Sequence, residues 1–176
     1  NRGVDKRTIF SSTSDYKRFL ILLYLANSNE DVRIDNVLKK CDYEEIFTLE
    51  RANPLVAIGA FCLMPNHFHI LATPLVDGGL SKFMLKIQTG YSMYFNKKND
   101  RSGSLFQGPF KSEHAGDDRY LKYLFSYIHL NPAKLQDPRW KDKIGRKNGT
   151  LRHFVETYRY SSLGEYLSGS HVITAP

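Results

Sequence analysis

The sequence has little cysteine and no long apolar segment. Cys41 and Cys62 are its only cysteines among 176 residues and form no C-x-x-C pair, so we expect no disulfide framework. No apolar run approaches the roughly 20 residues that a membrane-spanning helix needs, and no signal peptide is visible. These absences predict a cytoplasmic protein that does not bind membranes. Because the chain opens at Asn1 rather than at a methionine, we expect it to begin inside a longer gene product.

Acidic residues are scarce in two parts of the chain, although the net charge is only +7. Residues 80–111 contain several lysines and arginines but only one acid, Asp100, and residues 134–159 form a second basic stretch. Residues 28–53 are acidic instead. A polyanion such as nucleic acid is the natural partner of this polarised charge, and an ordinary solvated surface is the alternative.

The hydrophobic pattern predicts one main core with an α+β fold. We expect helices from the serine-rich segment 11–15 to about residue 27, over 80–97, and from 117 to 130, where Asn131 precedes Pro132. Apolar runs at 55–63 and 67–73 predict an antiparallel hairpin, and 109–114 a short further strand. The simplest architecture packs the helices on one face of an antiparallel sheet. The acidic segment 28–53 is a candidate inserted helical lobe.

Two histidines one residue apart, His67 and His69, lie in the second strand of the predicted hairpin. Because side chains alternate along a strand, both imidazoles point to one side, and Phe68 and Ile70 point to the other. Imidazole is the commonest protein metal ligand, so the pair could form half of a catalytic metal site. The alternative interpretation is that the two histidines simply form a partly exposed polar face of the strand.

The third predicted helix carries tyrosines along one face. Tyr120, Tyr123 and Tyr127 recur at intervals of three and four residues, and Asn131 follows Tyr127 by four. This spacing brings a phenol and an amide to the same face. The alternatives are that the tyrosines pack and that an asparagine before proline caps the helix.

Four segments of the chain resemble one known family. They are MPNHFHIL at 64–71, LFQGPFKS at 105–112, DRYL at 118–121 and YIHLNP at 127–132. In order and spacing they closely resemble the REP-associated tyrosine transposases, relatives of the single-strand insertion-sequence transposases within the HUH (His-hydrophobe-His) endonucleases. The resemblance runs from Asn1 to Ser162. It implies a ferredoxin-like antiparallel sheet and an enzyme that cleaves and rejoins single-stranded DNA at hairpin-forming palindromic repeats.

The resemblance also assigns roles to residues. It implies that His67 and His69 bind a divalent metal, that Asn131 completes this site, and that Tyr127 is the nucleophile, which becomes linked to a DNA 5′-phosphate and leaves a free 3′-hydroxyl. Tyr120 and Tyr123 lie close enough to be mistaken for it, and only the Tyr-x-x-x-Asn-Pro pattern favours Tyr127. The metal would be Mg²⁺ or Mn²⁺; two imidazoles and an amide suit Mn²⁺ or a weakly held Mg²⁺. The active unit would be a monomer or a homodimer, with the tyrosine helix acting on its own or on a second chain's histidines.

The predicted DNA contacts are basic or aromatic residues of the two basic stretches. Phe106, Phe110 and Lys111 interleave aromatic rings with charge, a pattern suited to stacking bases and holding phosphates, although core packing of the two phenylalanines is the alternative. The full set is Lys82, Lys86, Phe106, Phe110, Lys111, Arg139, Arg146, Lys147 and Arg152. We expect residues 1–133 to form the catalytic domain, residues 134–176 to be a basic extension packed on or beside it, and the protein to be nucleoid-associated.

Two functions of other classes remain open from sequence. A domesticated protein could bind DNA hairpins without cleaving them, but the presence of all four residue types expected for catalysis argues against it. A zinc hydrolase built on the histidine pair is the least favoured, because no carboxylate follows at a spacing that would complete such a site.

Overall fold

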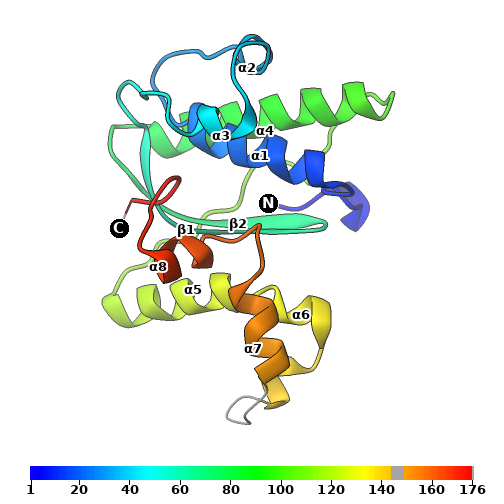
Figure 1. Ribbon diagram of the computed structural model, residues 1–176, viewed down its shortest axis with the longest axis vertical. Helices are drawn as coiled ribbons and strands as arrows, with labels where there is room; N and C mark the ends of the chain where they lie inside the picture. Colours follow the sequence, from blue (N-terminus) through cyan, green and yellow to red (C-terminus); the bar gives the residue numbers. More distant parts are fainter. Residues whose placement is uncertain (144–148, 176) are drawn as a thin grey trace.

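The computed structural model describes residues 1–143 and 149–175, in which an antiparallel hairpin lies between layers of helices (Figure 1). The elements are, in chain order, η1 (Val4–Lys6), α1 (Thr13–Leu25), α2 (Ile34–Val37), α3 (Tyr43–Ile46), β1 (Val56–Met64), β2 (His67–Pro74), α4 (Gly79–Lys98), α5 (Asp118–Leu130), α6 (Ala133–Gln136), η2 (Trp140–Lys143), α7 (Gly149–Glu156) and α8 (Leu163–Ser168). Among the helices of these residues, none has both the length and the apolar character that a membrane crossing requires.

The hairpin of β1 and β2 agrees with the two apolar runs of the sequence. Met64 pairs with His67, so Pro65 and Asn66 form the tight turn between the strands. The three predicted long helices correspond to α1, α4 and α5. The hairpin and these helices are therefore confirmed, with ends that differ by only a few residues.

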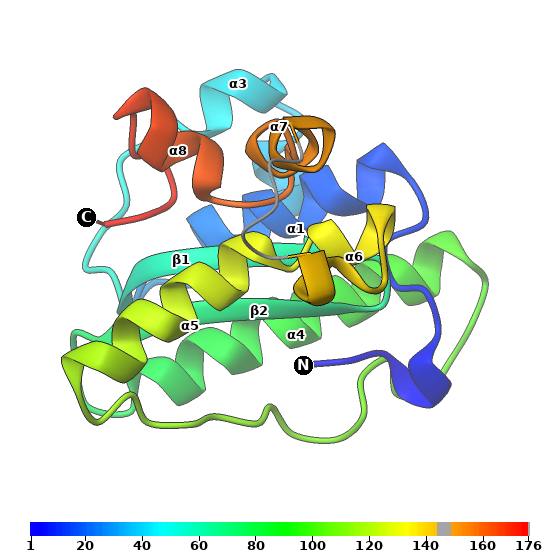
Figure 2. The same cartoon turned by 90° about the horizontal axis from the view of Figure 1, so that it is seen from below.

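Helices cover both faces of the hairpin (Figures 1 and 2). On one face α1 and α4 pack against apolar side chains that include Leu63 and Phe68. On the other face Ile128 of α5 packs against Ala60 and Cys62. The predicted α+β class is confirmed, but the helices are not confined to one face as expected. The reason is that residues 60–64 of β1 are all buried, so this strand needs cover on both sides.

Short backbone pairings cover the two edges of the hairpin. Arg2 bridges to His67 beside β2, and Ser161 bridges to Cys62 beside β1. Such pairings shorten the unpaired edges that a bare hairpin would expose.

The strand predicted over 109–114 is wrong. The backbone pairing in this part of the chain comes earlier, at Phe106, which bridges to Gly3, and at Gln107, whose N–H donates to the Arg2 carbonyl at 2.9 Å. Gly108 then adopts a φ of 68°, a left-handed conformation that turns the chain out of the ladder.

The acidic segment 28–53 carries α2 and α3 and joins α1 to β1. Asn27, which is 3% exposed, fixes the start of β1: its Nδ2 donates to the Val56 carbonyl at 2.8 Å, and its Oδ1 accepts from the N–H groups of Leu55 and Val56 at 3.0 Å. The segment thus contains two short helices, and a buried amide anchors one of its ends. That it is an inserted lobe stays a prediction.

The C-terminal segment returns to the free edge of β1. The Leu63 N–H donates to the Tyr160 carbonyl at 2.8 Å, and the Phe61 N–H donates to Ser162 Oγ at 2.9 Å. A small apolar cluster of Ala133, Trp140 and Val155 lies beside α6 and α7. The domain boundary at residue 133 stays a prediction, although residues beyond it complete the hydrogen bonding of β1.

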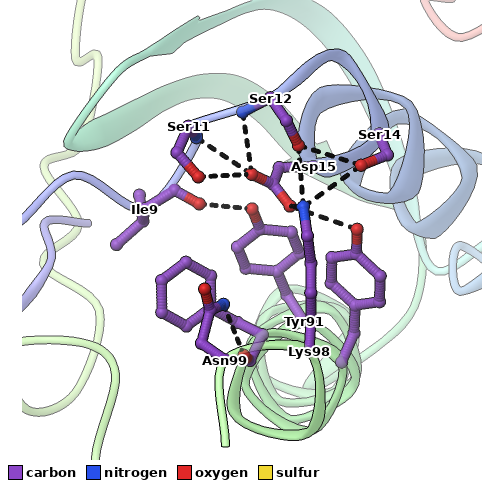
Figure 3. Close-up of polar contacts among 10 residues, drawn as sticks. Ile9, Ser11, Ser12, Ser14, Asp15, Tyr91, Lys98 and Asn99 are labelled. Atoms are coloured by element: carbon purple, nitrogen blue, oxygen red, sulfur yellow. Dashed lines mark hydrogen bonds and ion pairs between the residues drawn. The ribbon is translucent and has the colours of Figure 1, made fainter.

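A buried carboxylate links the start of α1 to the end of α4 (Figure 3). Asp15 is 0% exposed; its Oδ2 accepts from the N–H groups of Ser11 and Ser12 at 2.9 Å, and Lys98 Nζ lies 2.6 Å from its Oδ1. Burial by itself raises the pKa of Asp15, but the hydrogen bonds from Lys98, Ser11 and Ser12 outweigh it and lower the pKa to about 2.

We expect Asp15→Asn to lower the free energy of unfolding at pH 7 by about 2 kcal/mol, because a buried charged acceptor is lost. Since the folded-state pKa is about 2 and the ordinary value is 3.8, the native carboxylate stabilises the fold above about pH 4. The difference between the two proteins should therefore shrink as pH falls from 4 toward 2. Urea unfolding at several pH values measures this.

The matched control is Asp35→Asn, which removes the ion pair from Arg18 to a carboxylate that is 74% exposed. Exposed pairs contribute at most about 1 kcal/mol. Equal destabilisation by both substitutions, or a pH-independent gap for Asp15→Asn, would contradict the assignment.

Candidate active site

Strand β2 turns His67 and His69 toward the face that α5 covers. Alternation along the strand places Phe68, which is 2% exposed, in the core on the opposite side. The centroids of the two imidazole rings lie 5.0 Å apart, and the ring planes are nearly perpendicular at 89°. The two side chains therefore share one side of the sheet, as the sequence predicted.

Asn66, in the turn before β2, orients the first imidazole. Its Nδ2 donates to the Lys6 carbonyl at 3.2 Å, and its Oδ1 lies 2.6 Å from His67 Nδ1. Because the amide nitrogen is the donor in the first contact, the amide oxygen accepts the Nδ1 proton in the second. His67 Nε2 then keeps its lone pair, which is the state that a metal ligand needs.

Both imidazoles are neutral at neutral pH. Burial, reinforced by the neighbouring His69 and Arg2, lowers the pKa of His67 to about 3. Burial also lowers the pKa of His69 to about 4, with Lys134 among the nearby positive groups. A neutral imidazole can bind a metal without first releasing a proton.

Helix α5 brings Tyr127 to the histidines of the same chain. The helix starts at a well-formed cap, where the Asp117 side chain accepts from the Tyr120 N–H at 2.8 Å, and it ends one residue before Asn131. The rings of Tyr127 and His69 have centroids 5.6 Å apart at an angle of 81°. Tyr123 lies behind Tyr127 in a near-parallel arrangement, and Tyr120 lies beyond Tyr123. Tyr127 is therefore the tyrosine of this face that contacts the histidine pair.

Asn131 lies one turn after Tyr127 and is 1% exposed. Its Nδ2 donates to the Tyr127 carbonyl at 2.8 Å, and its Oδ1 accepts from Lys134 Nζ at 2.9 Å. An amide oxygen has two lone pairs, and Lys134 uses one of them. Asn131 thus keeps one acceptor position on a side chain that is otherwise held in place.

Lys134 and Lys141 are functional candidates that the sequence did not single out. Lys134 Nζ lies 5.1 Å and Lys141 Nζ lies 5.8 Å from the centroid of the Tyr127 ring, both within cation–π range. Although α5 ends at Leu130, Asn131 and Pro132 keep right-handed helical φ and ψ angles, and α6 follows at once. The sequence could therefore have indicated Lys134 as a neighbour of Tyr127, because residues seven apart lie on one helical face.

These side chains are of types that can bind a divalent ion. Among the residues that the structure describes, no three His, Cys, Asp or Glu side chains gather as metal ligands, so the histidine pair needs an amide, water or phosphate oxygen to complete a site. Two neutral imidazoles and the free lone pair of Asn131 supply a nitrogen and oxygen donor set that suits Mn²⁺ or a weakly held Mg²⁺.

The two predicted DNA-binding lysines of α4 contact the acidic segment instead. Lys82 Nζ donates to the Asn29 carbonyl at 3.1 Å. Lys86 Nζ donates to the Ser28 carbonyl at 2.8 Å and pairs with Asp31 at 3.2 Å. Both ammonium groups therefore hold the start of the acidic segment against α4, and this structure does not bring them to the histidine site.

The other predicted DNA contacts include both buried and exposed side chains. Phe106 is 4% exposed and packs edge-on against Phe68, so it is a core residue and cannot stack on a base. Phe110 is half-buried against the same core. Lys111, Arg139 and Arg152 are exposed, and Arg152 pairs with Glu156 at 2.7 Å. Arg146 and Lys147 lie outside the described residues.

One comparison with known proteins gives a match. The family model described as "Transposase IS200 like" matches residues 24–131, which is more than half of the chain. The matched range contains both histidines, Tyr127 and Asn131, and it ends before Lys134. No curated protein and no solved structure matches the chain.

Proposed function

Because the chain belongs to the IS200-like transposases, we propose that it cleaves single-stranded DNA and rejoins it through a covalent tyrosine–DNA intermediate. Transposases of this family act by DNA cleavage and transfer. The observation that carries the proposal is the ring contact between Tyr127 and His69 beside His67.

Tyr127 is the proposed nucleophile. Its phenolic oxygen gives up its proton and attacks the scissile phosphorus, the bond from phosphorus to the 3′-oxygen breaks, and that oxygen takes up a proton and leaves as a 3′-hydroxyl. The phosphotyrosine bond keeps the energy of a phosphodiester. A second 3′-hydroxyl can then displace Tyr127, which regains its proton, and the strand is joined without ATP.

His67, His69 and Asn131 are the proposed ligands of the metal. When bound there, a divalent ion would polarise the scissile phosphate and offset charge in the transition state. Asn66 contributes by fixing the His67 ring, and the Tyr127 carbonyl contributes by fixing the Asn131 amide. These contacts hold the donor atoms before substrate arrives, which avoids a reorganisation cost during the reaction.

Lys134 and Lys141 are proposed to balance negative charge at Tyr127. Their ammonium groups lie over the Tyr127 ring, where they favour a phosphate and the negative oxygen that leaves when the phosphotyrosine is resolved. The substrate proposed from the sequence motifs is a hairpin formed by an imperfect palindromic repeat with adjoining single-stranded DNA. The proposed location is the cytoplasm, at the nucleoid.

We expect Tyr127→Phe to abolish the covalent protein–DNA adduct, because the attacking oxygen is removed while the ring is kept. The measurement is denaturing gel electrophoresis after incubation with end-labelled hairpin DNA and Mn²⁺. Tyr123→Phe is the matched control and should form the adduct at the native level.

An adduct in Tyr127→Phe equal to that of the native chain would exclude Tyr127 as the nucleophile. If the native chain binds hairpin DNA tightly but forms no adduct with either Mg²⁺ or Mn²⁺, the protein is a non-catalytic hairpin-binding protein instead.

Removing divalent ions with a chelator should stop adduct formation, and added Mn²⁺ should restore it. Titration of Mn²⁺ followed by electron paramagnetic resonance tests the ligands separately from activity. His67→Gln should lose the site, whereas Asn66→Ala should weaken it by about 10- to 100-fold, because an outer contact rather than a ligand is removed. The control is His171→Gln, because the His171 ring contacts Thr174 and not the proposed site. This variant should bind Mn²⁺ like the native chain. Native Mn²⁺ affinity in His67→Gln would rule out this site.

Lys134→Gln should slow single-turnover cleavage by on the order of 100-fold, as does loss of other preorganised charge-stabilising groups. Lys134→Arg keeps the charge and should recover most of the rate. Rapid-quench kinetics at saturating DNA separates this effect from binding. If the glutamine and arginine variants are equally slow, the side chain acts through its shape and not through its charge.

A further inference from the structure

Three tyrosines form a continuous line of aromatic rings along one face of α5, which crosses the hairpin in Figure 2. We name Tyr120, Tyr123 and Tyr127 the tyrosine strip. Neighbouring rings are nearly parallel: the planes of Tyr120 and Tyr123 differ by 16° with centroids 6.2 Å apart, and those of Tyr123 and Tyr127 differ by 24° with centroids 6.1 Å apart. The strip ends at the ring that contacts His69.

The middle ring of the strip is open to solvent. Tyr123 is 56% exposed, although tyrosine is large and contributes most when it is buried. The core side of α5 is instead supplied by Ile128, with Phe125 packed beside it. Tyr123 is therefore not needed to hold α5 on the sheet, and more than half of its surface is open to a partner.

Charge differs between the two ends of the strip. At the inner end Lys134 and Lys141 lie over the ring of Tyr127. At the outer end the interaction of the Tyr120 hydroxyl with the nearby Glu113 carboxylate raises the pKa of Tyr120. A partner that carries both flat rings and negative charge is favoured at the inner end, and its charge is disfavoured beyond Tyr120.

We propose that the tyrosine strip is a stacking surface for unpaired DNA bases, which guides a single strand along α5 to Tyr127 with its phosphates near Lys134 and Lys141. The proposal rests on the proposed cleavage function, because it assigns the path of that substrate. Every base has a π face, so stacking on tyrosine accepts any sequence. A paired stem hides its base faces and would not use this surface.

The test measures binding of a short fluorescent oligo-dT, which forms no hairpin, to the full chain in the presence of a chelator so that no cleavage occurs. Tyr123→Leu keeps apolar bulk but loses the π face, and it should bind about 5- to 100-fold more weakly. Tyr123→Phe keeps the ring and should bind like the native chain. Leu121→Ala, which truncates another exposed side chain of α5 at 41% exposure, is the matched control and should also bind normally.

Salt dependence separates stacking from phosphate contact. The slope of log Kd against log salt should be unchanged in Tyr123→Leu and shallower in Lys141→Gln, because only the lysine releases counterions. Circular dichroism and Tm of Tyr123→Leu should match the native values, since the ring is exposed. Native affinity in Tyr123→Leu, or equal losses in the leucine and phenylalanine variants, overturns the proposal.

Failure of the proposed cleavage function would give a different result from failure of the stacking proposal. An adduct that does not depend on Tyr127 changes the chemistry but leaves the binding measurement intact. If Tyr123→Leu weakens oligo-dT and a blunt duplex alike, stacking on unpaired bases is wrong even when Tyr127 is the nucleophile.

Discussion

Antiparallel pairing of β2 with β1 decides which side of the sheet each side chain of β2 faces, and the rest of the molecule is arranged around that choice. The pairing sends Phe68 to the side where α1 and α4 pack, and the flanking histidines to the side of α5. A slip of one residue would place both imidazoles in the apolar core and Phe68 in the site. Burial of Phe68 thus protects the register on which the histidine pair depends.

The proposed site combines two neutral imidazoles with positive charge that comes from elsewhere in the chain. Burial keeps His67 and His69 unprotonated, so they are ready to bind metal and add no charge of their own. The positive groups over Tyr127 come from beyond the end of α5. Because Asn131 and Pro132 keep helical backbone angles, Lys134 stays on the face of Tyr127 and contacts Asn131 directly. A short continuation of one helix therefore joins the proposed nucleophile, the proposed third ligand and a cation.

The pattern of apolar residues along the sequence was enough to predict the hairpin and the long helices, because these elements depend on residues that are close together in the chain. Two apolar runs separated by a short turn at residues 64–66 predicted the hairpin, and helical periodicity predicted α1, α4 and α5. The resemblance to HUH transposases agrees with the family match over residues 24–131. The same local reasoning was wrong for 109–114, because a strand forms only when another strand pairs with it, and the bridge to the N-terminal segment is made by Phe106 instead.

The sequence by itself determined the hairpin, the alternation that puts His67 and His69 on one side, and the spacing that puts Tyr127 and Asn131 on one helical face, since each depends on neighbours within a few residues. Only the tertiary structure decided that α5 covers the histidine side, that Phe106 belongs to the core, and that Lys82 and Lys86 hold the acidic segment. These outcomes depend on contacts between residues far apart in the chain. Burial and charge pairing at such contacts follow from how whole elements pack, and no short pattern encodes them.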